Sequence, residues 1–266
     1  MSETFNEPKN SVVSKRRLAT IREPVGEAAK LSDLSEKLLE DVDQTILESL
    51  LQHCRICYLE PAQYLHLVRK HRRFIYVLRK GYVTVSLKTK ENEPAKFLAW
   101  RKPGQLLGEM EALYPDTDTI SARLKATDKC ELLEIPSKIL INIADNTPAI
   151  YRNVCSLLIE KNFEHRRRAD VLKLRTPLDR VRATLIHLRR ERGYELDNKT
   201  IKGNIRPQDI AGFIGEDPDR VTPKLDMLVE EGSIEYINSD EMREFKGKRI
   251  EGKKIKIRNE KLLSEK

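Results

Sequence analysis

Hydrophobic and polar positions divide the chain into helical stretches near both ends and a β-rich stretch between them. Residues 1–30 show no periodicity and mix Ser, Asn, Pro and charged residues, so we expect a flexible tail there. From Leu31 to Leu51, apolar residues recur every three or four positions, which predicts a helix. Ser32 and Ser35 are suitable N-caps for that helix.

A β-rich pattern follows the predicted helix. Val83, Val85 and Leu87 alternate with polar residues, as expected for a strand with one buried face. Turn residues separate several short β-branched or aromatic runs, namely Phe74–Leu78, Tyr82–Leu87, Phe97–Trp100 and Leu132–Ile135. Many short strands predict a jelly roll or similar barrel, in a domain that spans residues 31–146.

A long helix is predicted over residues 147–175. Thr147 and Pro148 suit its N-cap and first turn, and neither Gly nor Pro interrupts residues 149–173. Lys161 and Arg168 interrupt an otherwise heptad-like series of apolar, aromatic and histidine positions, which are Tyr151, Val154, Leu158, His165 and Leu172. Such a stripe between two domains is typical of a dimer interface, so we expect a homodimer whose helices meet at Val154 and Leu158.

Residues 176–266 read as helices followed by a hairpin. One helix runs from Leu178 to Arg192, a short one covers Arg206–Ile214 with Gly215 as its C-cap, and Asp217-Pro218 opens another that ends at Gly232. Ile234–Ile237 and Ile250–Ile257 can then pair as a strand hairpin. Two short helices and a wing can place a helix in the DNA major groove, although a generic three-helix module has the same pattern.

The distribution of charge favours a polyanionic partner. The 266 residues carry a net charge of +8. Residues 152–192 hold twelve Lys/Arg against five Asp/Glu, and residues 245–261 hold eight against two. Charge alone does not distinguish a DNA-binding surface from faces that are simply solvated. The two surpluses lie beside the predicted helix-turn-helix and in its wing, however, and these positions favour DNA.

Other features restrict the class of protein. The sequence has no apolar run near the roughly 18 residues of a membrane helix, and its four cysteines form no disulfide framework, so we expect a cytoplasmic protein without a membrane partner. It lacks a phosphate-binding Gly-rich loop, a G-x-S-x-G motif and an H-E-x-x-H motif, so we do not expect an enzyme.

Ordered fragments from Leu34 to Arg258 carry a family resemblance. The first half contains Gly81-Tyr-Val-Thr-Val, Pro103-Gly104-Gln-Leu-Leu-Gly108-Glu109 and Cys130-Glu-Leu-Leu-Glu-Ile135-Pro136. The second half contains Gln208-Asp209-Ile210-Ala211, Gly215, Val221, Leu225, Leu228, Glu231-Gly232 and Ile234. In this order and spacing, the chain resembles the catabolite activator / fumarate–nitrate regulator (CRP/FNR) superfamily.

The resemblance implies an α+β fold and a regulatory role. Its parts would be a cyclic-nucleotide-binding-like β-roll (jelly roll), a long dimerisation helix and a C-terminal winged helix-turn-helix in residues 176–266. It implies a dimeric transcription regulator that binds specific double-stranded DNA under the control of an effector in the β-roll, with RNA polymerase as a candidate partner. The alternative is an effector-binding module that acts through protein partners and keeps a vestigial DNA-binding domain.

The implied effector pocket departs from the cyclic AMP pattern. The resemblance assigns Gly108 and Glu109 to the ribose and Ser121 to the cyclic phosphate, but Ile120 stands where the phosphate-binding arginine belongs. His165 and Arg166 replace the pair that meets the adenine. Because a buried phosphate without its arginine loses a bidentate partner, we do not expect cyclic AMP, and the effector stays unidentified. The arginines at positions 166–168 are either solvated or hold another anionic effector.

Metal cofactors are not expected. One branch of the superfamily holds an iron–sulfur cluster with four cysteines, but no cysteine precedes Cys54 here. Cys54 and Cys57 should point to opposite faces of a strand, and Cys130 occupies a position that relatives bury. The five histidines show no paired spacing typical of haem ligands, so we expect no metal, haem or cluster.

The predicted recognition helix supplies the candidate DNA contacts. Candidates for the groove are Asp219, Arg220, Thr222 and Lys224, and candidates for phosphates are Gln208, Lys248, Lys253 and Lys254. Pro223 stands where relatives carry arginine, and a proline inside a helix removes a backbone hydrogen bond. Either the helix begins later, with Thr222 as N-cap and Pro223 as its first residue, or it no longer reads bases.

Overall fold

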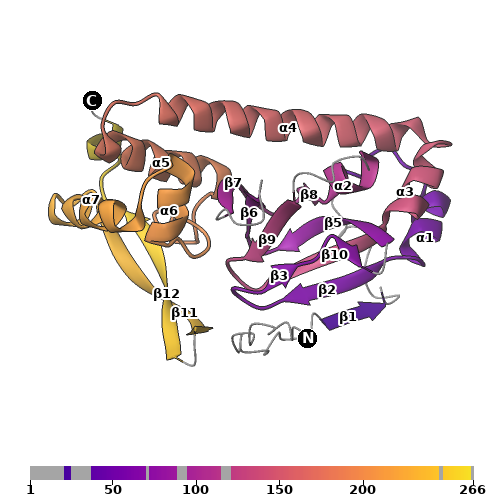
Figure 1. Ribbon diagram of the computed structural model, residues 1–266, viewed down its shortest axis with the longest axis horizontal. Helices are drawn as coiled ribbons and strands as arrows, with labels where there is room; N and C mark the ends of the chain where they lie inside the picture. The colour runs from indigo at the N-terminus through magenta and orange to yellow at the C-terminus, as the bar shows by residue number, and fades with distance from the viewer. Residues whose placement is uncertain are drawn as a thin grey trace, which may run out of the picture.

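One long helix, α4 (Pro148–Leu172), runs along both halves of the molecule and joins them (Figure 1). The computed structural model describes residues 21–24, 37–69, 72–88, 95–114, 121–245 and 248–264. A β-roll with three short helices packs under the N-terminal half of α4, and a helical domain with a projecting hairpin packs under its C-terminal half. Thr147 is the N-cap of α4 and Pro148 its first residue, as predicted.

Two antiparallel sheets form the β-roll. The first has the strand order β1-β2-β10-β5-β4, with β8 also paired to β5, and the second has the order β3-β9-β6-β7. Their bounds are β1 Ile21–Pro24, β2 Arg55–Leu59, β3 Tyr64–Leu65, β4 Val68–Arg69, β5 Arg72–Lys80, β6 Val83–Lys88, β7 Lys96–Arg101, β8 Leu106–Leu107, β9 Ser121–Ala126 and β10 Cys130–Pro136. The predicted jelly-roll architecture is therefore confirmed.

Side chains of the first sheet point alternately to its two faces, and each face contributes to a different hydrophobic core. Ile75 and Val77 of β5 face a core that they share with helices α1, α3 and α4, whereas Tyr76 and Leu78 face the core between the sheets. A strand whose two faces are both covered reads as a continuous apolar run, which is what residues 74–78 show. The helices of this half are α1 Gln44–Leu51, α2 Glu109–Leu113 and α3 Ser137–Ala144.

The N-terminal region differs from the prediction in two ways. Ile21–Pro24 form strand β1, which pairs with β2, so this part of the predicted flexible tail is ordered. The predicted helix over residues 31–51 is shorter, because Asp43 caps α1 by accepting a hydrogen bond from the backbone N–H of Thr45 at 2.8 Å. Residues 37–41 form turns before Asp43, and the two predicted caps, Ser32 and Ser35, lie outside the described residues.

The C-terminal half is a winged helix-turn-helix domain. Helices α5 (Pro177–Arg192), α6 (Pro207–Ile214), α7 (Pro218–Glu230) and α8 (Glu260–Ser264) surround one apolar core. Gly215 adopts a positive φ of 70° at the end of α6, which confirms it as the C-cap that turns the chain into α7. Strands β11 (Ile234–Phe245) and β12 (Lys248–Ile257) form a hairpin that is longer than predicted.

Helix α7 corrects the prediction for Pro223. Asp217 is the N-cap, its carboxylate accepts a hydrogen bond from the backbone of Asp219 at 2.9 Å, and Pro218 is the first residue. Pro223 therefore lies inside the helix, and the late start with Thr222 as N-cap is wrong. The helix tolerates the proline because Asp219, whose carbonyl loses its partner, is exposed to water.

The structure contradicts the predicted dimer interface at Val154. Val154 is only 6% exposed and packs in the β-roll core of its own chain, and Leu158 packs against the same core. Ile159 and Phe163 are 57% and 51% exposed instead. With the exposed residues Tyr151 and Cys155 they form the outer stripe, in which each residue is four positions from the next.

Candidate functional site

The helix-turn-helix exposes most of the residues that the sequence singled out for DNA. Gln208 lies exposed in the first turn of α6, and Asp219, Arg220 and Thr222 are exposed on α7. The side chain of Arg220 is 78% exposed, and its guanidinium lies 3.8 Å from the carboxylate of Glu216. Lys224 is half-buried, and the Thr222 hydroxyl donates a hydrogen bond to the carbonyl of Pro218 at 3.1 Å. Arg220 is therefore the candidate with most freedom to reach a base.

The surroundings of α7 are acidic. Between residues 216 and 231 the chain carries two basic residues, Arg220 and Lys224, against six acidic ones, which are Glu216, Asp217, Asp219, Asp226, Glu230 and Glu231. All of the acids except Glu216 are exposed. Because carboxylates repel phosphates, attraction to a DNA backbone has to come from other elements.

The wing carries positive charge, but two lysines near its attachment to the domain already form ion pairs with acidic residues of the same chain. The Lys254 ammonium lies 2.7 Å from Glu195, and Lys256 lies 3.3 Å from Asp197. Bonds from Thr200 and Lys199 hold the pKa of Asp197 below its usual range. The side chains of the other two predicted wing lysines, Lys248 and Lys253, lie outside the described residues.

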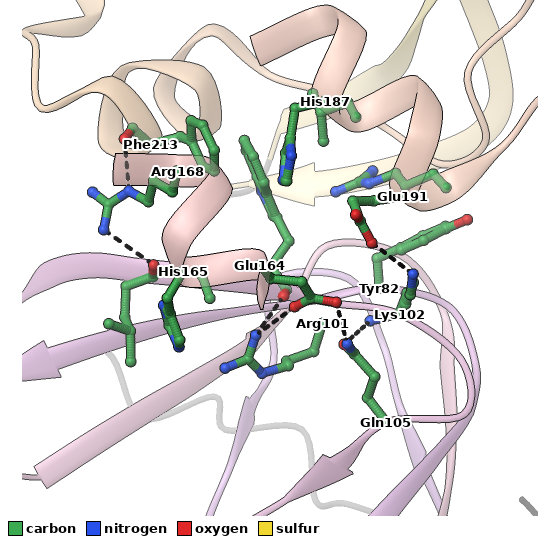
Figure 2. Close-up of a pocket in the computed structure, with 15 residues that line it drawn as sticks. Tyr82, Arg101, Lys102, Gln105, Glu164, His165, Arg168, His187, Glu191 and Phe213 are labelled. Atoms are coloured by element: carbon green, nitrogen blue, oxygen red, sulfur yellow. Dashed lines mark hydrogen bonds and ion pairs between the residues drawn. The ribbon is translucent and has the colours of Figure 1, made fainter. Parts of the chain in front are cut away.

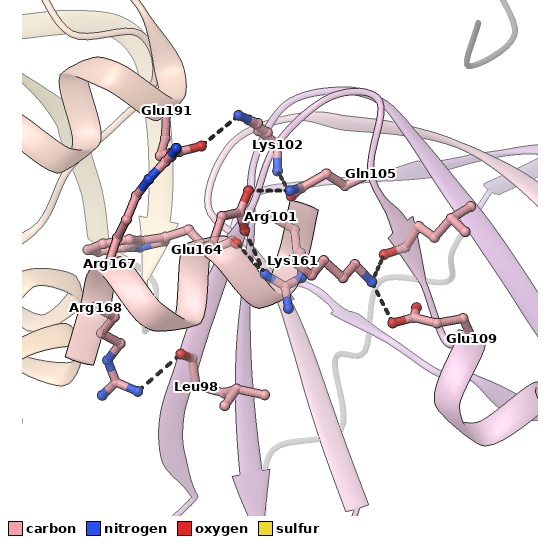
Figure 3. Close-up of polar contacts among 12 residues, drawn as sticks. Leu98, Arg101, Lys102, Gln105, Glu109, Lys161, Glu164, Arg167, Arg168 and Glu191 are labelled. Atoms are coloured by element: carbon pink, nitrogen blue, oxygen red, sulfur yellow. Dashed lines mark hydrogen bonds and ion pairs between the residues drawn. The ribbon is translucent and has the colours of Figure 1, made fainter. Parts of the chain in front are cut away.

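The predicted effector residues Gly108 and Glu109 lie where α2 meets α4. Gly108 has a φ of +81°, and a Cβ there would come within 2.7 Å of the Phe74 carbonyl, so glycine is required. Glu109 is buried, and its carboxylate lies 2.5 Å from the ammonium of Lys161 on α4 (Figure 3). The same ammonium donates a hydrogen bond to the Leu106 carbonyl at 2.7 Å. Burial lowers the pKa of Lys161, and the Glu109 carboxylate opposes that shift.

Two more polar residues follow Lys161 along the same side of α4, and we call Lys161, Glu164 and Arg168 the inner polar row. Glu164 accepts hydrogen bonds from Gln105 at 2.5 Å and from buried Arg101 at 3.3 Å. Burial raises the pKa of Glu164, and Arg101 opposes the shift. The Arg168 guanidinium donates to the carbonyls of Phe213 at 2.8 Å, Leu98 at 3.2 Å and Gly212 at 3.3 Å. The row therefore ties α4 to the β-roll and to α6.

The remaining effector candidates do not gather around Glu109. His165 is half-buried, and its pKa is lowered by burial and then by Arg101 and Arg168. Arg166 is exposed, with its guanidinium 5.9 Å from the ring centroid of Phe163. The side chain of Ser121 lies outside the described residues, as does Ile120. Arg167 is also exposed, and its guanidinium lies 2.5 Å from the Glu191 carboxylate. Of the three arginines only Arg168 faces the interior.

Aromatic rings, hydrogen bonds and the ion pair between Lys102 and Glu191 join the two halves (Figure 2). Phe213 of α6 stacks on Trp100 of β7 and on His187 of α5, with centroid distances of 4.6 and 5.0 Å. Burial lowers the pKa of His187 to about 4. The backbone and side-chain amides of Asn204 donate to buried Asp128 at 3.0 and 2.7 Å. Sequence reasoning missed this interface, because its members are far apart in the chain.

Three of the four cysteines are buried, as predicted for core residues. Cys54 and Cys57 are buried and lie in the two different cores on opposite faces of the first sheet. Cys130 is also buried, and Cys155 is exposed. In the part of the chain that the structure describes, no three His, Cys, Asp or Glu residues cluster as metal ligands, and no helix is long and apolar enough to span a bilayer.

Comparison with known proteins places this architecture. Residues 56–147 match the family described as Cyclic nucleotide-binding domain. A CooA mutant from Carboxydothermus hydrogenoformans is similar in structure, with a TM-score of 0.59 and 16% identity over 86% of this chain and 93% of that one. A CRP/FNR family transcriptional regulator from Thermus thermophilus has a TM-score of 0.56 and 20% identity over 79% of this chain and 96% of that one.

The chain has the fold of the CRP/FNR transcription regulators. The c-di-GMP responsive global regulator CLP from Xanthomonas campestris gives the same result, with a TM-score of 0.58 and 17% identity over 82% of this chain and all of that one. At such low identities the solved structures establish the fold of this chain and nothing finer. No curated protein matches its sequence.

Proposed function

We propose that this CRP/FNR-like protein is a cytoplasmic, dimeric transcription regulator that binds specific double-stranded DNA. The observation that carries the proposal is the pair α6 and α7, joined at Gly215 and followed by the β11–β12 wing. A helix-turn-helix of this kind can present its second helix to a major groove. RNA polymerase is a further candidate partner, and four cysteines that are not in disulfide bonds suit a reducing cytoplasm.

Base reading and phosphate binding fall to different residues. Arg220 is the candidate for guanine, with Asp219, Thr222 and Lys224 beside it on α7. Because the acidic residues around α7 repel phosphates, the candidates for phosphate contacts lie on other elements. They are Gln208, Lys248, Lys253 and Lys254.

Selection of binding sites from random duplexes tests the proposal. Arg220→Ala should weaken binding to the selected site by about 1–3 kcal/mol and leave random DNA nearly unaffected. Lys253→Ala should weaken binding to all sequences and reduce the slope of log affinity against log salt by about one. Lys138→Ala, on α3 far from the wing, is the control and should change neither quantity. Failure to enrich any sequence would refute specific DNA reading.

The dimer is proposed to form through the outer stripe of α4. Ile159 and Phe163 are large, exposed and one helical turn apart, so two copies of the stripe can bury them against each other. Ile159→Asp with Phe163→Asp should give monomers in sedimentation, because dimerisation would bury the new charges. Glu160→Asp, on the same turn, should stay dimeric. Dimers in the double variant would place the interface elsewhere.

A protein-binding function is the second candidate, and the acidic face of α7 favours it. An exposed helix face with three acids of its own and an acid at each cap, together with Met227 and Pro223, suits a basic protein segment better than a phosphate backbone. In that case the selection experiment yields no preferred site, and Asp226→Lys does not change the affinity for random duplexes.

A further inference from the structure

The ligand that a cyclic nucleotide-binding domain implies does not fit the residues at the α2–α4 contact. The resemblance assigns Glu109 to the ribose hydroxyl, but its carboxylate is 2.5 Å from the Lys161 ammonium. Both side chains are at least 90% buried. A ribose could reach Glu109 only if Lys161 left, which would strand a buried charge.

We propose that Lys161 is a built-in ligand of the β-roll, which holds Glu109 and the Leu106 carbonyl in place of a nucleotide and makes the domain independent of cyclic nucleotides. The ammonium is a three-fold donor, and two of its hydrogen bonds go to groups of the β8–α2 segment. Lys161 belongs to α4, so this bond joins the β-roll to the helix that carries the C-terminal domain (Figure 3).

The rest of the inner polar row extends the same connection. Glu164 binds Arg101 and Gln105 one turn further along α4, and Arg168 binds β7 and the end of α6 after another turn. Spacings of three and four residues put the three side chains on one side of the helix. An arrangement that a bound effector would otherwise stabilise is therefore maintained by the chain itself. The consequence for DNA binding rests on the proposed function, whereas the role of Lys161 does not.

Melting temperatures measured without DNA test the pair. Lys161→Ala should lower the melting temperature by about 10 °C, because Glu109 is left buried without a partner. Adding Glu109→Gln to that variant should restore part of the loss, since the stranded charge is removed. Lys173→Met, which alters an exposed lysine just after the same helix, should shift the melting temperature by less than about 2 °C. Additive effects of the two substitutions would overturn the proposal.

Chemical rescue separates a bound ammonium from simple packing. Ethylammonium chloride should raise the melting temperature of Lys161→Ala relative to equal sodium chloride, because the small cation can bind the freed carboxylate. It should do nothing for the wild type or for the variant that also lacks Glu109. A rescue that persists without Glu109, or none at all, contradicts the assignment.

Nucleotide titration tests the other half of the proposal. Calorimetry of the wild-type protein with cyclic AMP or cyclic GMP should show no saturable heat up to about 1 mM nucleotide. Saturable binding in the low micromolar range would show that Lys161 yields to a nucleotide. Because neither this titration nor the melting experiments involve DNA, their outcome is independent of whether α7 reads an operator.

Discussion

At the scale of single residues, the position of an arginine on α4 decides whether its guanidinium is exposed or forms hydrogen bonds inside the protein. Arg166 and Arg168 are two positions apart, yet one is exposed and the other donates to three carbonyls across the junction of the two halves. Arg168→Met should lower the free energy of unfolding by about 2 kcal/mol, because charged hydrogen bonds to these carbonyls are lost. Urea unfolding measures the change. Arg166→Met is the matched control and should stay within about 0.5 kcal/mol of wild type, so equal effects of the two would contradict this division of roles.

The same residues show how far the sequence leads. Period-two alternation and turn residues predicted the β-roll, and caps such as Pro148 and Gly215 predicted the helix ends. The heptad pattern on α4 placed Val154 at a dimer interface although it packs in the core of its own chain, because an apolar stripe against the chain's own β-roll looks like one against a partner. Lys161 and Arg168 break that stripe, and their partners Glu109 and Gly212 are 52 and 44 residues away. Only the folded structure shows that Lys161 and Arg168, which interrupt the apolar stripe, form polar contacts with the β-roll and with α6.

At the scale of elements, α7 carries an internal proline at a cost in stability. Pro223 removes a helical hydrogen bond in the middle of an otherwise regular helix of 13 residues. Pro223→Ala should therefore stabilise the protein by about 1–2 kcal/mol, less than the full cost of a helical proline because the unfolded chain becomes more flexible. Denaturant midpoints measure it, with exposed Val229→Ala as a control on the same helix. A loss of stability would mean that the surrounding helix has adapted to the ring.

At the scale of the whole molecule, the interface between the halves should respond to acid. His187 stacks on Phe213 there, and burial lowers its pKa to about 4, against 6.5 in an unfolded chain. The unfolded state thus binds more protons between these values, so this contribution to stability is present above pH 6.5 and is lost as the pH falls towards 4. From pH 7 to pH 5 the loss due to His187 should be about 2 kcal/mol.

Substitution of the histidine isolates its share of the acid response. His187→Phe keeps a ring on Phe213 and cannot titrate, so urea unfolding at pH 7 and pH 5 should show a smaller loss than in wild type. Exposed His53→Asn controls for histidines outside the interface and should leave the acid response unchanged. The same loss in His187→Phe as in wild type would assign the acid sensitivity to other groups.

The ring stack between the halves also gives the protein an optical signal of its own. Trp100 is the single tryptophan of the chain, and its ring extends from β7 to stack on Phe213 of α6. An indole held in an apolar contact emits at shorter wavelength than one in water, so separation of the halves would shift its emission to the red. Movement of the C-terminal domain away from the β-roll, caused by a ligand, a duplex or a partner, can therefore be followed in real time in unlabelled protein by the emission wavelength of Trp100.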